Sequence, residues 1–311
     1  MIGTLFFGVA VLHTFAVKRF QSLAAKFPEG SVKENLFHLL GEIEVVFGFW
    51  AGVWFLYSCF TTSYSETLHY IESLNFNEPL FVFVIMTVAA TRPVIFAARK
   101  LIFFLSGLIP VHSKISRYLM TLILGPLLGS FITEPAAMTV TALILLNEFY
   151  NQNVSEKFKY FTVGVLFVNV SIGGVLTHYA APPVLMVAGK WGWDSAFMMT
   201  HFGWKAIIAV VGNALLGTLL FAKELKSQQM TSKENARVPF WLIVIHLLFL
   251  VGIVLSAHHP VMFLAMFLFF LGIADISKEY QDPIQLKSSL LVAFFLAGLV
   301  VFGQMQTWWL Q

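Results

Sequence analysis

Long apolar stretches recur along the whole chain, and they constrain its fold more than any other feature. A helix of about 20 apolar residues is long enough to cross the ~30 Å hydrocarbon layer of a bilayer. The sequence therefore predicts an all-α protein, a polytopic bundle of transmembrane helices. The candidate crossings are residues 2–17, 36–60, 79–98, 160–190 with an interruption, 203–222, 239–257, 260–274 and 288–310.

The composition agrees with a chain that lies in a membrane. Hydrophobic residues make up 58% of the 311 positions and charged residues only 11%, against about 25% charged residues in soluble domains. We therefore expect no soluble domain between the crossings. The single cysteine, Cys59, excludes a disulfide framework and is expected to be a small packing residue.

Lys and Arg gather in alternate loops, and this distribution predicts the orientation of the chain. Basic loops stay on the cytoplasmic side of a membrane. The loop at 61–78 carries three glutamates but no Lys or Arg, so we expect it to face outward, as we expect of the N-terminus. The segments expected to be cytoplasmic are residues 18–33, 99–117, 157–159, 223–237 and 278–287.

The stretch between Arg117 and Tyr150 predicts a helical hairpin that enters and leaves the membrane on one side. Residues 129–141 read GSFITEPAAMTVT, and the break falls at 132–135. A proline disfavours helical geometry at the preceding residue, here Glu134, and suits the first position of a new helix. Each arm, at about 22 Å, is then too short to span. The alternative is a kinked helix whose Glu134 forms a salt bridge with a neighbour.

A second interruption lies at 169–183, which reads NVSIGGVLTHYAAPP. The Gly-Gly and Pro-Pro pairs bracket a short polar stretch inside an apolar segment, which predicts a broken helix. Non-helical backbone is tolerated in a membrane only where it is buried in protein or lines a wet cavity. We expect Asn169, Ser171, Thr177 and His178 to hold a hard cation or a substrate there through their oxygen and nitrogen atoms. Thr133 and Glu134 of the hairpin are expected to complete this site.

The early helix carries further charge within its apolar run. Glu42 and Glu44 lie in the predicted crossing at 36–60, and His38 lies one turn before Glu42. We expect one of these glutamates to pair with Arg92 of the next crossing, because pairing neutralises two costly charges. The other glutamate, or Glu134, would then carry protons. A metal site at His38 and Glu42 is the weaker alternative, since two ligands do not fill a coordination shell.

The two interrupted segments carry a family resemblance. GSFITEPAAMTVTALIL and VNVSIGGVLTHYAAPPVLMVAGKWGWD resemble bacterial sodium/proton antiporters of the ion-transporter superfamily, which also contains arsenite-pump channels and dicarboxylate carriers, and FHLLGEIEVVFGFWAG at 37–52 resembles their early helix. The resemblance implies a half-site for Na⁺ and protons built by Glu134, Asn169, Gly173 and Gly174. It also implies a bacterial inner (plasma) membrane and no cofactor.

The resemblance further implies two inverted repeats, each with a hairpin and a broken helix. The expected division is a first repeat at 1–222, a basic loop at 223–238 and the start of a second repeat at 239–311, so that the chain holds about one and a half repeats. A second acid-bearing hairpin is absent from the sequence. Either the chain is a shortened form, or a second copy in a homodimer supplies the missing half-site.

Three functions are compatible with these residues. Cation/proton antiport is favoured, because the interrupted segments offer a carboxylate and neutral oxygens. An anion or dicarboxylate carrier would need cationic side chains at mid-depth, where only Arg92 qualifies. A membrane-embedded enzyme using His38, Glu42 and His178 is least favoured, because the chain lacks the usual hydrolase and phosphate-binding motifs. The net charge of +3 gives no reason to expect a nucleic-acid partner.

Overall fold

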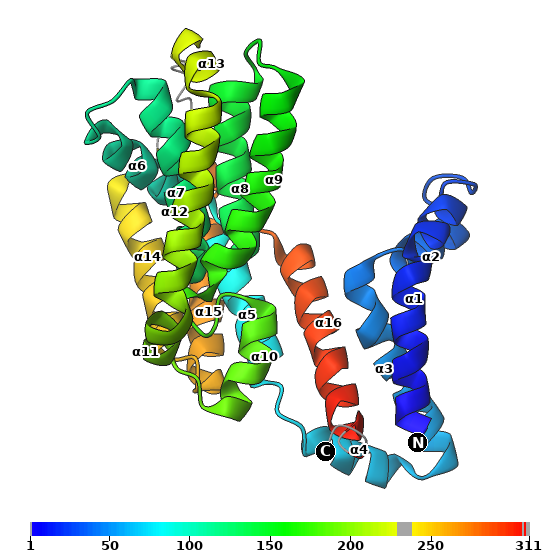
Figure 1. The fold of residues 1–311 in the computed structure, drawn as a ribbon. Helices are drawn as coiled ribbons and strands as arrows, with labels where there is room; N and C mark the ends of the chain where they lie inside the picture. Colours follow the sequence, from blue (N-terminus) through cyan, green and yellow to red (C-terminus); the bar gives the residue numbers. More distant parts are fainter. Residues whose placement is uncertain (1, 229–237, 307, 309–311) are drawn as a thin grey trace. The chain divides into compact units, whose positions relative to one another are not determined.

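The computed structural model describes residues 2–228, 238–306 and 308, and these residues form helices with no strand among them (Figure 1). The predicted all-α class is confirmed. The chain divides into two compact units, one made of Met1–Phe83 and Leu286–Gln311 and the other of Val84–Gln285. This division follows packing and does not test the predicted repeats.

Six of the described helical segments are long and apolar enough to cross a membrane, which makes this a multi-pass membrane protein. The helices Tyr64–Glu72 and Asn77–Ala89 qualify together but are bent by 61° at the break between them. Two shorter apolar helices are Phe240–Leu255 and Pro260–Ile276. The six segments are Ile2–Ala24, Ile43–Thr61, Ser113–Ile132, Glu156–Leu176, Ser195–Leu220 and Leu286–Gln306.

The first unit is built around three apolar helices: α1 (Ile2–Ala24), α3 (Val46–Thr61) and α16 (Leu286–Gly303). Helices α3 and α16 cross so closely that a Cβ atom on Gly298 would overlap the backbone of Phe47. A buried histidine of α1 ties the unit together, because His13 Nδ1 accepts a hydrogen bond from Trp50 Nε1 (3.0 Å) and its Nε2 donates to the Leu40 carbonyl (2.9 Å).

The predicted crossing at 36–60 is wrong at its beginning. Helix α2 (Val32–Leu40) ends before Gly41, and the candidate span begins with the 3₁₀ turn at Ile43–Val45. Gly41 allows a close approach to α1, since a Cβ atom there would lie 2.8 Å from Gln21 Cγ. The Gln21 side chain also donates to the Gly41 carbonyl (2.8 Å). His38 and Glu42 therefore precede the candidate span.

The predicted crossing at 79–98 is also wrong, because the chain breaks within it. Helix α5 (Asn77–Ala89) ends, Thr91 is extended, and α6 (Arg92–Gly107) begins with a proline in its first turn. A proline is well placed there because it lacks the N–H that an internal helix position requires. Helix α6 buries only one face, while α4 (Tyr64–Glu72) and α5 form the bent pair instead.

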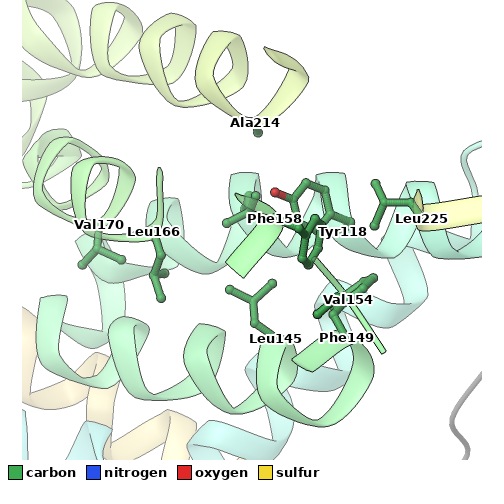
Figure 2. Close-up of a cluster of buried hydrophobic side chains, with 10 residues drawn as sticks. Tyr118, Leu145, Phe149, Val154, Phe158, Leu166, Val170, Ala214 and Leu225 are labelled. Atoms are coloured by element: carbon green, nitrogen blue, oxygen red, sulfur yellow. The ribbon is translucent and has the colours of Figure 1, made fainter. Parts of the chain in front are cut away.

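The second unit packs α7 (Ser113–Ile132), α8 (Glu134–Leu145), α9 (Glu156–Gly173) and α12 (Trp204–Leu220) against one another. Figure 2 shows the core at one end of this bundle, where the rings of Tyr118, Phe149 and Phe158 lie together. The hydroxyl groups of Tyr118 and Thr162 lie 2.8 Å apart in this core.

Shorter elements complete the second unit. Helix α10 (Pro182–Trp191) and α11 (Ser195–Met198) connect α9 to the π-helical turn Met199–Gly203 before α12. Helices α14 (Phe240–Leu255) and α15 (Pro260–Ile276) lie side by side, and α14 also packs on α6 (Figure 1). The predicted basic loop begins with the short helix α13 (Ala222–Ser227). Some residues named in the sequence predictions lie outside the described part of the chain: Lys233, Arg237, Trp309, Leu310 and Gln311.

Candidate functional site

Helices α7 and α8 fold back on each other, which confirms the predicted helical hairpin. A Cβ atom on Gly129 would lie 3.1 Å from Ala137 Cβ, and a Cβ atom on Gly125 would overlap the Thr141 side chain. The residues that face each other are equally far from the turn along the two arms, as in an antiparallel pair of helices. The predicted arm length is wrong for α7, which has 20 residues, about 30 Å, and is long enough to span.

The break in the hairpin lies at Thr133, within the predicted range 132–135, although the sequence predicts that Glu134 rather than Thr133 leaves the helix. Thr133 has φ 73° and ψ 152°, and it is the one described residue other than glycine with a positive φ. Glu134 is the first residue of α8, and Pro135 follows it within the first turn. A β-branched residue in this backbone region is strained by about 1–3 kcal/mol. The surrounding contacts must therefore hold the tip in place.

The predicted broken helix is confirmed. Helix α9 ends at Gly173, a 3₁₀ turn covers Gly174–Leu176, and α10 begins only at Pro182. Residues 177–181 between them form no helix.

Ser130 of the hairpin joins this break to the tip. Its Oγ donates to the Gly173 carbonyl (2.6 Å) and accepts from the Leu176 N–H (2.9 Å), while Thr177 Oγ1 donates to the Ser130 carbonyl (2.6 Å). These buried bonds satisfy backbone groups that the end of α9 leaves unpaired. Nothing in the sequence indicates these bonds, because the nearest partner of Ser130 lies 43 positions away along the chain.

The two adjacent glycines bring the broken helix against the hairpin. A Cβ atom on Gly173 would lie 2.6 Å from the Pro126 carbonyl oxygen, and one on Gly174 would lie 2.5 Å from Glu134 Oε1. The structure therefore brings together Glu134, Gly173 and Gly174, as the resemblance implies. The Glu134 carboxylate lies directly over the backbone of the break.

Two oxygen-bearing side chains at the tip have no partner. Among the described residues, the half-buried Glu134 carboxylate makes no hydrogen bond or ion pair, and the buried Thr133 Oγ1 accepts and donates none. The alternative of a kinked helix with a salt-bridged Glu134 thus gains no support. Carboxylate and hydroxyl oxygens are the ligands that hard cations prefer. The tip can offer both to a small cation.

Asn169 has a different role from the predicted one. Its Nδ2 donates to the carbonyls of Leu122 (2.9 Å) and Val210 (3.2 Å), and its Oδ1 accepts from Asn213 Nδ2 (3.0 Å). Both the nitrogen and the oxygen of this buried amide are thus hydrogen-bonded, and these bonds join α7, α9 and α12. Asn213 is not among the predicted residues, although an asparagine within the apolar run at 203–222 is a signal that could have indicated it.

The remaining predicted ligands, as far as the described residues show, make no hydrogen bond to the Glu134 carboxylate or the Thr133 hydroxyl group. Ser171 is exposed on α9, and Thr177 is committed to Ser130. His178 Nδ1 lies 2.9 Å from Ser195 Oγ, and its ring stacks on that of His258 with the centroids 6.2 Å apart. Within the described part of the chain, no group of three or more His, Cys, Asp or Glu side chains is arranged to hold a metal ion.

A comparison with known families completes the description of the site. A family described as "Putative Na+/H+ antiporter" has a sequence model that matches residues 1–311. The chain belongs to this family. Membership indicates a multi-pass membrane transporter for cations and protons rather than an enzyme. No curated protein matches the chain.

In this antiporter-family chain, Arg92 has a partner that the sequence does not predict. Its guanidinium forms an ion pair with Asp282, and this hydrogen bond holds the pKa of Asp282 below its usual range. Glu42 lies 3.9 Å from His38. Pairing of Arg92 with Glu42 or Glu44 stays a prediction, because these glutamates belong to the other unit.

The base of the hairpin holds a buried ionic cluster that the sequence predictions do not include. Lys114 Nζ donates to the carbonyl of Glu148 (2.7 Å) and lies 3.3 Å from its Oε2. Arg117 Nη1 donates to the same Oε2 (3.0 Å). The Lys114 side chain is fully buried and that of Glu148 is 3% exposed. These three charges lock the two arms together at the end opposite the tip.

Proposed function

We propose that the chain exchanges Na⁺ for protons, and that the Glu134 carboxylate binds the two in turn. The observation that carries this proposal is the unpaired state of that carboxylate at the hairpin tip. A partly desolvated carboxylate without a cationic neighbour is costly, and its cost falls when it binds either a proton or a cation. Both ligands use the same oxygens, so the binding of one excludes the other. This competition couples the two fluxes.

The surroundings of Glu134 support a cation as the second ligand. Thr133 Oγ1 is buried, unpartnered and adjacent in the chain, so it can add a neutral oxygen. The Ser130 and Asn169 bonds hold the backbone of the break against the hairpin, which keeps these oxygens in a fixed place. We assign the predicted glycines Gly173 and Gly174 to this packing.

The alternative of an anion carrier loses support from the placement of the basic side chains. Arg117 and Lys114 lie at the base of the hairpin, and Arg117 is separated from Thr133 by most of α7, about 24 Å at the helical rise per residue. An anion site at the tip would need such side chains near Glu134. The tip instead offers negative charge, which favours a cation.

Two further parts of the proposal concern the membrane in which the protein lies and the number of copies that assemble. We expect it in a bacterial inner membrane, and we expect a second copy to supply the half-site that the family resemblance implies. Light scattering of the detergent-solubilised protein measures the copy number directly. A mass corresponding to one chain would contradict the homodimer and leave the Glu134 proposal unaffected.

Flux in reconstituted vesicles tests the antiport proposal. Vesicles with an acidic interior and a trapped pH-sensitive dye should lose their pH gradient when Na⁺ is added outside, because Na⁺ enters as protons leave. Glu134→Gln keeps the side-chain shape but removes the charge, so its Na⁺-driven proton movement should be abolished. The matched control is Glu66→Gln, at an exposed position of α4, which should behave like the wild type. Full activity of Glu134→Gln would overturn the assignment of the carrier residue.

A further inference from the structure

A cluster of basic side chains beside the base of the hairpin has more charge than its acids neutralise. Lys114 and Arg117 share one carboxylate, that of Glu148. Arg99 of α6 lies at the same place, because the guanidinium carbons of Arg99 and Arg117 lie 5.2 and 4.8 Å from the centroid of one ring, Phe103. Two cations therefore share one acid, and a third, Arg99, lies against the same ring as Arg117.

Arg99 is the group that this arrangement leaves unsatisfied. Its Nε is buried and has no hydrogen-bond partner within the described residues. Contact with the Phe103 ring stabilises the charge but satisfies no N–H donor. An unpaired buried donor on a cation costs free energy that an anion would recover. The Arg117 side chain is 25% exposed, so the cluster is not closed off from its surroundings.

The neighbouring surface of α6 is apolar. Leu101 and Phe104 of this helix and its C-cap residue Leu108 lie on one side by their spacing, and all three are exposed, Phe104 to 66%. Another side of the helix packs into the unit through Ala98, Ile102 and Ser106. Among the described helices, α6 is not one of those apolar enough to cross a membrane. An amphipathic helix of this kind lies in the membrane interface, with its apolar face towards the acyl chains.

We propose that Arg99 and Arg117 bind the phosphate of an anionic phospholipid headgroup, with the acyl chains of that lipid on Leu101, Phe104 and Leu108. Both guanidiniums contact the Phe103 ring, and guanidinium groups pair with phosphate oxygens through two N–H donors. The basic loops place this end of the unit on the predicted cytoplasmic side, where anionic lipids attract basic segments. The charge excess distinguishes an anionic headgroup from a zwitterionic one.

Native mass spectrometry of the full chain, released from detergent, tests the proposal. The protein is titrated with phosphatidylglycerol or with phosphatidylcholine of the same acyl chains. The wild type should bind phosphatidylglycerol more tightly, and Arg99→Gln should weaken that binding about fivefold, the effect of losing one basic residue near an anionic surface. Phosphatidylcholine binding should stay unchanged. The matched control is Lys157→Gln, an exposed residue on the same predicted side, which should keep the preference.

Arg99→Lys provides a second variant if Arg99→Gln does not fold. It keeps the charge but loses the Nε–H. Its affinity for phosphatidylglycerol should therefore be lower than that of the wild type and of Lys157→Gln, but higher than that of Arg99→Gln. Retention of the full preference by Arg99→Gln or by Arg99→Lys would overturn the proposal. Displacement of phosphatidylglycerol by an excess of inorganic phosphate, with equal affinity, would also overturn it, because the site would then bind a soluble anion.

Discussion

At the scale of single residues, the hairpin tip has two unusual features: the backbone of Thr133 is strained, and the carboxylate of Glu134 has no partner among the described residues. A glycine at 133 would adopt the observed backbone without strain, but it would remove the buried hydroxyl group. Strained backbone of this kind clusters at functional sites, where the surrounding structure holds it in place. The bonds of Ser130 to the broken helix are the contacts that do so here.

The two glycines of the break should respond differently to substitution. Gly173→Ala brings a methyl group against the Pro126 backbone, which cannot turn away, so thermal stability in detergent should fall. Gly174→Ala meets the flexible Glu134 side chain, so folding should survive while transport decreases. Gly164→Ala on the same helix is the control, because no atom lies near its Cβ position, and it should be neutral or stabilising by about 0.5–1 kcal/mol. Equal stability losses in the first two variants would contradict this division.

The Arg92–Asp282 ion pair predicts a pH dependence of stability. Because folding lowers the pKa of Asp282, the pair stabilises the protein above the ordinary Asp pKa of about 3.9, and the contribution is lost as the pH falls through the lower folded-state pKa. Both side chains are partly exposed, so the effect should be at most about 1 kcal/mol.

Thermal unfolding of the wild type and Asp282→Asn across this pH range measures the effect. The variant should be less stable near neutral pH and equal to the wild type at the acid end. Asp275→Asn, in the exposed pair with Lys278, is the control and should change little. A difference between Asp282→Asn and the wild type that is constant at every pH would show that the pair has no electrostatic role.

At the scale of helices, the buried cluster of Lys114, Arg117 and Glu148 fixes the base of the hairpin. Glu148→Gln leaves the fully buried Lys114 without a counter-charge, so the free energy of unfolding should fall by about 3–5 kcal/mol. Adding Lys114→Met should recover part of the loss, since the uncompensated charge is removed as well. Chemical denaturation in detergent measures both variants. A double variant no more stable than the single one would show that the two residues do not interact.

The sequence predicts the hairpin and the broken helix because proline and glycine act locally. The Glu-Pro pair at 134–135 and the glycines at 173–174 interrupt apolar runs, and both breaks are confirmed. The exact residue of the first break is not predicted, since Thr133 rather than Glu134 absorbs the turn. The division of the predicted third crossing at Thr91 is missed, although Arg92 and Pro93 interrupt the apolar run there and Pro93 is a signal that could have indicated a helix start.

The sequence does not predict which polar side chains bond to each other within the second unit. Ser130, Asn213 and Glu148 each bond to a residue more than 30 positions away, and such pairs depend on tertiary packing. Arg117 and Lys114 are read from the sequence only as loop charges that set topology. Asn169 is predicted as a ligand of the cation site, but its amide bonds to the carbonyls of Leu122 and Val210, which the sequence does not indicate.

At the scale of the whole molecule, the distribution of Lys and Arg predicts that the N-terminus is outside and that both ends of the hairpin face the cytoplasm. Single cysteines on a Cys59→Ser background test this in intact cells. Ser65→Cys, exposed in the predicted outer loop, should react with a membrane-impermeant maleimide, whereas Asn153→Cys, exposed between the hairpin and α9, should react only after the cells are broken. Strong labelling of Asn153→Cys from outside would reverse the topology.

The central claim is that Na⁺ and a proton compete for the Glu134 carboxylate. The most direct measurement is the release of protons when Na⁺ is added to the purified, weakly buffered protein, followed with a pH indicator. The wild type should release protons on addition of NaCl but not of choline chloride, and Glu134→Gln should release none while Glu66→Gln keeps the wild-type signal. A Glu134→Gln variant that still releases protons on addition of Na⁺ would contradict the claim and show that the exchange occurs on another group.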